Sequence, residues 1–70
     1  MIEYRIRAYF KEVYPDRTYH NRIYTDLDTA RRDLKKATNY YQQFNPKLRD
    51  DILVDRVVIE YRDSQWKELK

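Results

Sequence analysis

Apolar and polar side chains alternate strictly along the start of the chain. Apolar Ile2, Tyr4, Ile6, Ala8 and Phe10 are interleaved with Glu3, Arg5, Arg7, Tyr9 and Lys11. Because successive side chains of a strand point to opposite faces, residues 2–14 are predicted to form a strand with one buried face. A second strand is predicted over residues 18–25, with Ile23 as its clearest inward-facing residue. Pro15 and Asp16 predict the turn between them, since Pro favours the first central position of a turn.

The middle of the chain has a helical period. Apolar residues recur in steps of three and four, which places one continuous apolar stripe along a helix: Leu27, Ala30, Leu34, Ala37, Tyr41 and Phe44. Thr25 is predicted to cap the amino end of this helix, with Asp26 and Asp28 in its first turn. Asn45-Pro46 is predicted to end it, because Pro cannot continue a helix.

A third strand is predicted over residues 53–62, after a charged connection at residues 47–51. Its inward residues are Val57, Ile59 and Tyr61. Ser64-Gln65-Trp66 then forms either a bulged extension of this strand or a short fourth strand. The order is therefore ββαβ, with or without a final strand.

These elements predict one small α+β domain over residues 1–70. A right-handed crossover from the second strand through the helix makes the third strand parallel to the second. The third strand then lies beside the first and antiparallel to it. The result is a three- or four-stranded antiparallel sheet of order 2-1-3, with one helix packed on one face.

A two-residue turn at Pro15-Asp16 predicts the register of the hairpin. Ala8 would then face Ile23 on the helix side, while Arg7 faces Tyr24 and Tyr9 faces Arg22 on the open side. The predicted partner-binding residues are those on the open side, namely Arg5, Arg7, Tyr9, Lys11, His20, Arg22 and Tyr24 from the hairpin and Arg56 and Arg62 from the third strand. Two interpretations stay open. The Tyr–Arg pairs either stabilise a thin sheet through cation–π contacts or bind a partner, since Tyr and Arg are enriched at binding hot spots.

Composition narrows the class of protein. The 70 residues carry a net charge of +3, which is too modest to make nucleic acid the default partner. No cysteine is present, which excludes disulfides and favours a reducing compartment. No apolar run approaches the ~18 residues of a membrane span, and the start has no signal-peptide pattern. We expect a cytoplasmic protein without a membrane partner, in the host cytoplasm if the chain is phage-encoded.

The sequence offers little for catalysis. Glycine is absent, which excludes the glycine-rich loops that hold phosphates. His20 is the single histidine and Ser64 the single serine, and a Ser–His pair would have to join the second strand to the end of the third. Asp50-Asp51 lies among basic residues and is interpreted as a solvated turn. We therefore expect no enzyme, no metal and no cofactor.

Three stretches carry a resemblance at the level of the fold. They are Tyr4-x-Ile6-x-Ala8-x-Phe10, Thr25-Asp26-Leu27-x-x-Ala30-x-x-x-Leu34 and Val57-x-Ile59-Glu60-x-Arg62-x-x-x-Trp66. The chain resembles small uncharacterised phage and prophage proteins with a hairpin, one helix and a closing strand. The resemblance implies an accessory protein that binds and inhibits a host or defence protein. It assigns no site residues.

The predicted function is therefore a non-enzymatic protein-binding module that uses its open Tyr/Arg sheet face. The alternative is single-stranded nucleic-acid binding by the same face, because aromatic rings among basic residues can stack on unpaired bases. The exposed sheet edges also allow a homodimer, by edge pairing or by face packing.

Overall fold

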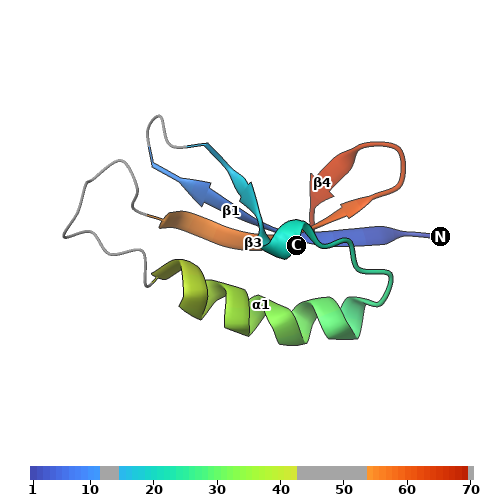
Figure 1. The fold of residues 1–70 in the computed structure, drawn as a ribbon. Helices are drawn as coiled ribbons and strands as arrows, with labels where there is room; N and C mark the ends of the chain where they lie inside the picture. Colours follow the sequence, from blue (N-terminus) through green and yellow to red (C-terminus); the bar gives the residue numbers. More distant parts are fainter. Residues whose placement is uncertain (12–14, 43–53, 70) are drawn as a thin grey trace.

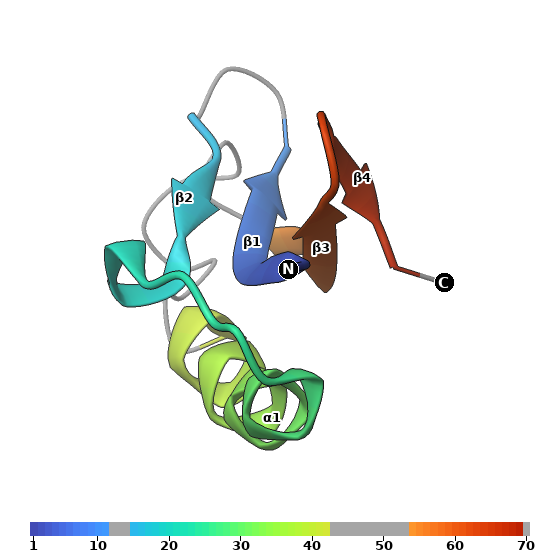
Figure 2. The ribbon, with the colours of Figure 1, turned by 90° about the vertical axis from the view of Figure 1, so that its right-hand side faces the viewer.

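The computed structural model describes residues 1–11, 15–42 and 54–69. Its elements are β1 (Glu3–Phe10), β2 (Arg17–Thr18), the 3-10 helix η1 (Tyr19–Asn21), α1 (Leu27–Gln42), β3 (Val54–Arg62) and β4 (Trp66–Glu68). The strands form one antiparallel sheet of order β2-β1-β3-β4, and α1 lies along one face of it (Figures 1 and 2). The predicted α+β class and the 2-1-3 order are confirmed, and the last segment is a fourth strand.

The pairing of β1 with β3 forms the centre of the sheet. Their register is continuous from Glu3 opposite Arg62 to Tyr9 opposite Arg56, and a bulge then places Phe10 opposite Val54. The predicted alternation in β1 is confirmed, because Ile6, Ala8 and Phe10 are buried.

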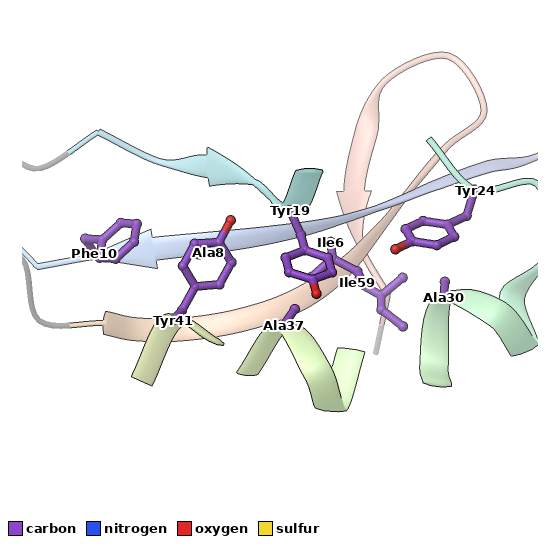
Figure 3. Close-up of a cluster of buried hydrophobic side chains, with 9 residues drawn as sticks. All are labelled: Ile6, Ala8, Phe10, Tyr19, Tyr24, Ala30, Ala37, Tyr41 and Ile59. Carbon is purple, nitrogen blue, oxygen red and sulfur yellow. The ribbon is translucent and has the colours of Figure 1, made fainter. Parts of the chain in front are cut away.

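The core lies between this strand pair and α1. Figure 3 shows its nine buried side chains: Ile6, Ala8, Phe10, Tyr19, Tyr24, Ala30, Ala37, Tyr41 and Ile59. Ala8, Ala30 and Ala37 are fully buried, and their small side chains let the helix backbone approach the sheet closely. Tyr41 fills the space near the end of α1, where its ring meets Phe10 edge to face at a centroid distance of 5.9 Å.

The helix begins one residue later than predicted. Asp26, not Thr25, caps it: its Oδ2 accepts from the Thr29 hydroxyl at 2.7 Å and its Oδ1 from the Asp28 N–H at 3.3 Å. The Asp26 carbonyl accepts the Ala30 N–H at 3.1 Å. The hydrogen bond from Thr29 lowers the pKa of the Asp26 carboxyl. The predicted helix end at Asn45-Pro46, the connection at 47–51 and Asp50-Asp51 lie outside the described residues.

The predicted second strand is wrong over most of its length. Only Arg17 and Thr18 form β2, and Arg7 faces Thr18 where a two-residue turn would have placed Tyr24. His20 and Asn21 follow with φ of 53° and 50°, in the left-handed region. Two such residues in succession turn the chain out of the sheet and end the pairing, because a strand needs extended backbone at every position.

The chain returns to β1 only at Tyr24, which bridges Tyr4 by two backbone hydrogen bonds of 2.7 and 2.8 Å. Tyr24 therefore shares the helix side with Tyr4, and its side chain is 2% exposed. Its neighbour Ile23 consequently points the other way and is 44% exposed, which corrects the prediction that Ile23 faces inward.

Candidate functional site

The sheet face opposite α1 carries a group of charged and aromatic side chains. We call it the open face (Figure 2). By strand alternation and register it is formed by Glu3, Arg5, Arg7 and Tyr9 of β1, Arg56, Val58, Glu60 and Arg62 of β3, and Trp66 and Glu68 of β4.

Trp66 stands at one end of the open face. The guanidinium carbon of Arg5 lies 4.1 Å from the centroid of its ring, and that of Arg62 lies 4.7 Å away. The geometry follows from the hairpin of β3 and β4, because Arg62 and Trp66 are direct cross-strand partners. Both contacts lie within the range of cation–π attraction. Sequence reasoning missed Trp66 as a site residue. Its short separation from Arg62 along the chain, across Asp63-Ser64-Gln65, is compatible with a hairpin loop and could have indicated the pairing.

Tyr9 stands at the other end and repeats this arrangement. Arg56, its cross-strand partner, lies 4.2 Å from the ring centroid, and Arg7 lies 5.8 Å from it. The predicted Tyr9–Arg22 pair is therefore replaced by Tyr9–Arg56. Each aromatic ring of the open face thus has two arginines close to it.

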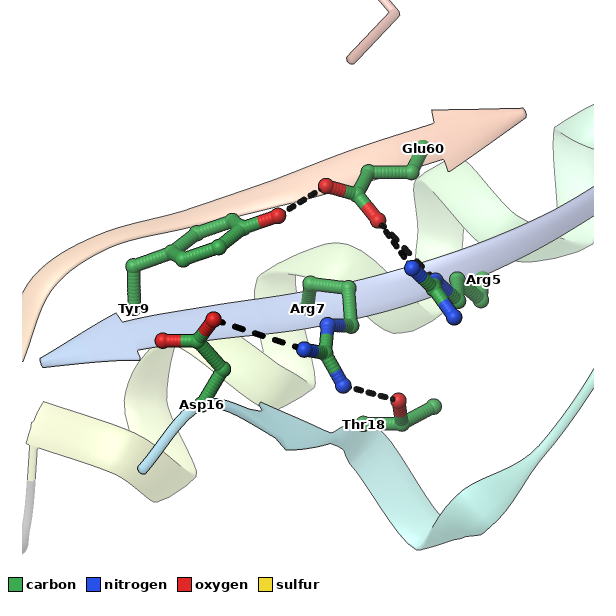
Figure 4. Close-up of polar contacts among 6 residues, drawn as sticks. All are labelled: Arg5, Arg7, Tyr9, Asp16, Thr18 and Glu60. Atoms are coloured by element: carbon green, nitrogen blue, oxygen red, sulfur yellow. Dashed lines mark hydrogen bonds and ion pairs between the residues drawn. The ribbon is translucent and has the colours of Figure 1, made fainter. Parts of the chain in front are cut away.

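Glu60 connects the two ends. Its side chain is buried, and the whole residue is only 6% exposed. Arg5 donates to its Oε1 from Nε at 2.9 Å and pairs with it through Nη2 at 2.8 Å, while the Tyr9 hydroxyl donates to Oε2 (Figure 4). Burial, followed by the hydrogen bond to Glu60, raises the pKa of Tyr9. Since a buried carboxylate needs charged or hydrogen-bonding partners, Glu60 holds Arg5 and Tyr9 in fixed positions.

The remaining arginines of the open face also have acidic partners. Arg62 pairs with Glu3, and Arg56 pairs with Glu68 at 3.3 Å and with Asp55 at 3.4 Å. Arg7 donates to the Thr18 hydroxyl at 2.9 Å and pairs with Asp16 at 3.5 Å (Figure 4). Positive and negative groups are therefore mixed across the open face.

The predicted site residues are divided by the fold. Arg5, Arg7, Tyr9, Arg56 and Arg62 lie together on the open face, as predicted. Lys11 is exposed beyond the end of β1, and His20 lies in η1 against the Tyr19 ring at a centroid distance of 4.1 Å.

Tyr24 and Arg22 lie on the helix side, which corrects their predicted place opposite Arg7 and Tyr9. The Tyr24 hydroxyl donates to Asp33 Oδ2 of α1 at 2.8 Å, and Arg22 pairs with the same oxygen at 3.3 Å. The Arg22 guanidinium lies 4.4 Å from the Tyr24 ring centroid. Burial raises the pKa of Tyr24 to about 12, with the Asp33 hydrogen bond as the next cause. These two residues attach the returning chain to the helix.

Comparison with known proteins found no family model, no curated protein and no solved structure that matches the chain. The described residues contain no helix long and apolar enough to cross a membrane. Within the same ranges, His, Asp and Glu form no group of three that could hold a metal ion.

Proposed function

We propose that this protein is a non-enzymatic binding module that docks its open face onto the surface of a partner protein. The observation that carries the proposal is the arrangement of Trp66 and Tyr9, each beside two arginines on the sheet face that α1 leaves uncovered. Trp, Tyr and Arg are the residue types most enriched among binding hot spots.

The rigidity of the face supports the same proposal. The buried carboxylate of Glu60 fixes the side chains of Arg5 and Tyr9 by hydrogen bonds. All three residues lie on the central strand pair of the sheet, β1 and β3. Side chains that are already ordered lose less conformational entropy when a partner binds. The open face therefore has the preorganisation that a docking surface needs.

The charge pattern favours protein over nucleic acid as the partner. Every arginine named on the open face has an acidic neighbour, so few cations are left to neutralise phosphates. The rings of Trp66 and Tyr9 already contact guanidinium groups, which would have to move before a base could stack. A protein surface with mixed charges complements this face better.

The partner class that we propose is a host or defence protein that an accessory protein of phage type would inhibit by occupying its surface. A second copy of the chain, packed face to face, is the other protein partner that the open face allows. Edge pairing is less favourable because β2 and β4 are only two and three residues long.

The test is an affinity purification from host lysate followed by measurement of binding to the purified partner. Trp66→Ala and Arg62→Ala are compared with wild type, and Lys35→Ala on the exposed side of α1 is the matched control. We expect Trp66→Ala to weaken binding by about thirtyfold or more, as hot-spot residues do, and Lys35→Ala to leave it unchanged. Circular dichroism checks that each variant is folded.

Three results would contradict the proposal. The first is equal affinity for wild type and both open-face variants. The second is tight binding of a single-stranded oligonucleotide that falls steeply with salt, which would assign the face to nucleic acid. The third is a dimer in sedimentation that Trp66→Ala dissociates while no other protein is retained, which would assign the face to self-association.

A further inference from the structure

The side of α1 that points away from the sheet carries a cluster of cations. The buried residues of α1 are Ala30, Ala37 and Tyr41, and Figure 2, which looks along the helix, shows the sheet on one side of it only. Four basic residues are exposed on the other side, namely Arg31, Arg32, Lys35 and Lys36. We call these four residues the α1 cation face.

The charges of the α1 cation face are not neutralised by neighbouring carboxylates. Within the described residues, the four side chains form no hydrogen bond and no ion pair. Arg32 acts on Asp26 through its charge alone: the pKa of Asp26 is lowered mainly by the Thr29 hydrogen bond, and Arg32 is a smaller cause. The open face differs, because each of its arginines has an acidic partner. The α1 cation face therefore presents its positive charge to solvent.

The spacing of the four cations spreads this charge over both margins of the helix. A helix turns by about 100° per residue, so Arg31 and Lys36 lie about 140° apart around the axis, with Arg32 and Lys35 between them. The 16 residues of α1 extend over about 24 Å. The result is a straight, rigid rod with cations along both sides of its uncovered surface.

From this geometry we infer that the α1 cation face binds duplex DNA by lying in its major groove. That groove is about 12 Å wide and admits an α-helix. Cations on the two margins of α1 then lie towards the two strands that border the groove, where they neutralise phosphates. Contacts to phosphates alone make the binding weak and independent of sequence. This activity is separate from protein docking, because α1 and the open face lie on opposite sides of the sheet.

Three other polyanions fit the α1 cation face less well. A bilayer surface holds an amphipathic helix by its apolar side, whereas the apolar residues of α1 pack against the sheet. Duplex RNA has a major groove that is too deep and narrow for side chains to enter. A single strand has one phosphate backbone and would meet one margin of the helix at a time.

The experiment is a titration of a fluorescently labelled mixed-sequence DNA duplex with the intact chain, followed by anisotropy at several salt concentrations. For four phosphate contacts we expect a slope of log affinity against log salt of about −3.6, which is a loss of about a hundredfold between about 50 and 200 mM salt. The duplex should bind several-fold more tightly than either of its single strands. For these the expected slope is shallower, at about −0.7 for each contact.

Two double variants remove the same charge from opposite sides of the molecule. Arg32→Gln/Lys36→Gln should make the salt slope shallower by about 1.8, because two phosphate contacts are lost. Arg62→Gln/Lys67→Gln, on β3 and β4, should leave the slope unchanged. Asp28→Asn should strengthen duplex binding, since it removes an exposed carboxylate one turn before Arg32. Circular dichroism checks that each variant is folded.

Four results would overturn the inference. The first is no binding of the duplex at about 50 mM salt, where affinity should be highest. The second is an equal loss in both double variants, which would show diffuse attraction by net charge. The third is tighter binding of polyglutamate than of the duplex at the same salt, which would assign the face to an acidic protein. The fourth is loss of duplex binding in Trp66→Ala, which would place the DNA on the open face.

The two proposals fail on different variants. Loss of protein docking is read from Trp66→Ala, which should leave duplex binding unchanged. Loss of duplex binding is read from Arg32→Gln/Lys36→Gln, whose open face is intact.

Discussion

The two flanks of β1 differ sharply. On one flank β3 pairs with all eight residues from Glu3 to Phe10. On the other flank the chain pairs with β1 at Arg17 and Thr18, leaves the sheet through η1, and pairs with β1 again at Tyr24. The same strand thus has one regular neighbour and one interrupted neighbour.

The two flanks show which features of a strand its alternation determines and which it does not. Alternation predicted the faces of β1 correctly, because each residue's face depends only on its own strand. The register against a neighbour depends on the connecting backbone. Arg7 already faces Thr18 before the two left-handed residues, and the pairing has shifted again where Tyr24 meets Tyr4 after them. On the interrupted flank, the predicted register placed Tyr24 on the surface, whereas the observed register buries it in the core.

The largest expected effect comes from truncating the observed inward residue of the interrupted flank, Tyr24, and comparing it with truncation of the predicted one, Ile23. Tyr24→Ala should lower the free energy of unfolding by about 3–5 kcal/mol, since it removes a buried aromatic ring. Ile23→Ala should change it by less than about 0.5 kcal/mol, because that side chain is exposed. Urea unfolding of both variants measures the contrast. A larger loss of stability in Ile23→Ala than in Tyr24→Ala would instead support the register predicted from a two-residue turn.

The regular flank can be weakened at Glu60. Glu60→Ala should cost about 2 kcal/mol, because Arg5 and the Tyr9 hydroxyl lose their shared buried acceptor. Glu68→Ala is the matched control: its ion pair with Arg56 is largely exposed, and its loss should cost less than about 1 kcal/mol. Denaturant midpoints compare the two. Equal small losses would mean that Glu60 does not organise the open face.

Tyr24→Phe tests how the returning chain is attached to α1. It should cost about 1–1.5 kcal/mol near neutral pH, since the hydrogen bond to Asp33 is lost. The folded pKa of Tyr24, about 12, lies above its ordinary 10.0, so the protonated hydroxyl favours the folded state. That contribution is complete below pH 10 and is lost as the pH rises towards 12.

The decline in wild-type stability between these pH values should therefore be smaller in Tyr24→Phe. Burial also raises the pKa values of Tyr9 and Tyr41, so a residual decline should remain in the variant. Thermal unfolding at several alkaline pH values measures both slopes. Parallel slopes would show that Tyr24 ionises as easily in the folded chain as in the unfolded one.

The smallest effect has the opposite sign. His20→Gly should raise the free energy of unfolding by up to about 1 kcal/mol, because glycine adopts the observed φ of 53° without steric conflict. Arg31→Gly, within α1, should lower it by a similar amount. Thermal melts of the two variants should shift in opposite directions. A loss of stability in His20→Gly would mean that the His20–Tyr19 ring contact outweighs the backbone cost.

The regular parts of the fold could be predicted from the chain, and the irregular parts could not. Steps of three and four identified α1 through Ala30 and Ala37, and alternation identified β1 and β3. Asp26 displaced Thr25 as the helix cap because either residue type can accept the capping hydrogen bonds, and only the path of the incoming chain decides between them.

The candidate site divides in the same way. Arg5, Arg7 and Tyr9 were predicted on the open face because they belong to the regular strand. Trp66 was missed because the fourth strand was left undecided, and its pairing with Arg62 depends on that hairpin. The turn at His20 and Asn21 was not predicted, although His and Asn are among the non-glycine residues most often found at positive φ.

The brevity of β2 and β4 has a consequence for how the protein behaves at high concentration. Long, flat outer strands recruit strands from other molecules and seed aggregates. Here the outer strands offer two and three residues, and they carry the charged side chains of Arg17, Lys67 and Glu68. We therefore expect both outer strands to be poor templates for intermolecular β-structure, and this aromatic-rich chain of 70 residues to resist aggregation through its sheet edges.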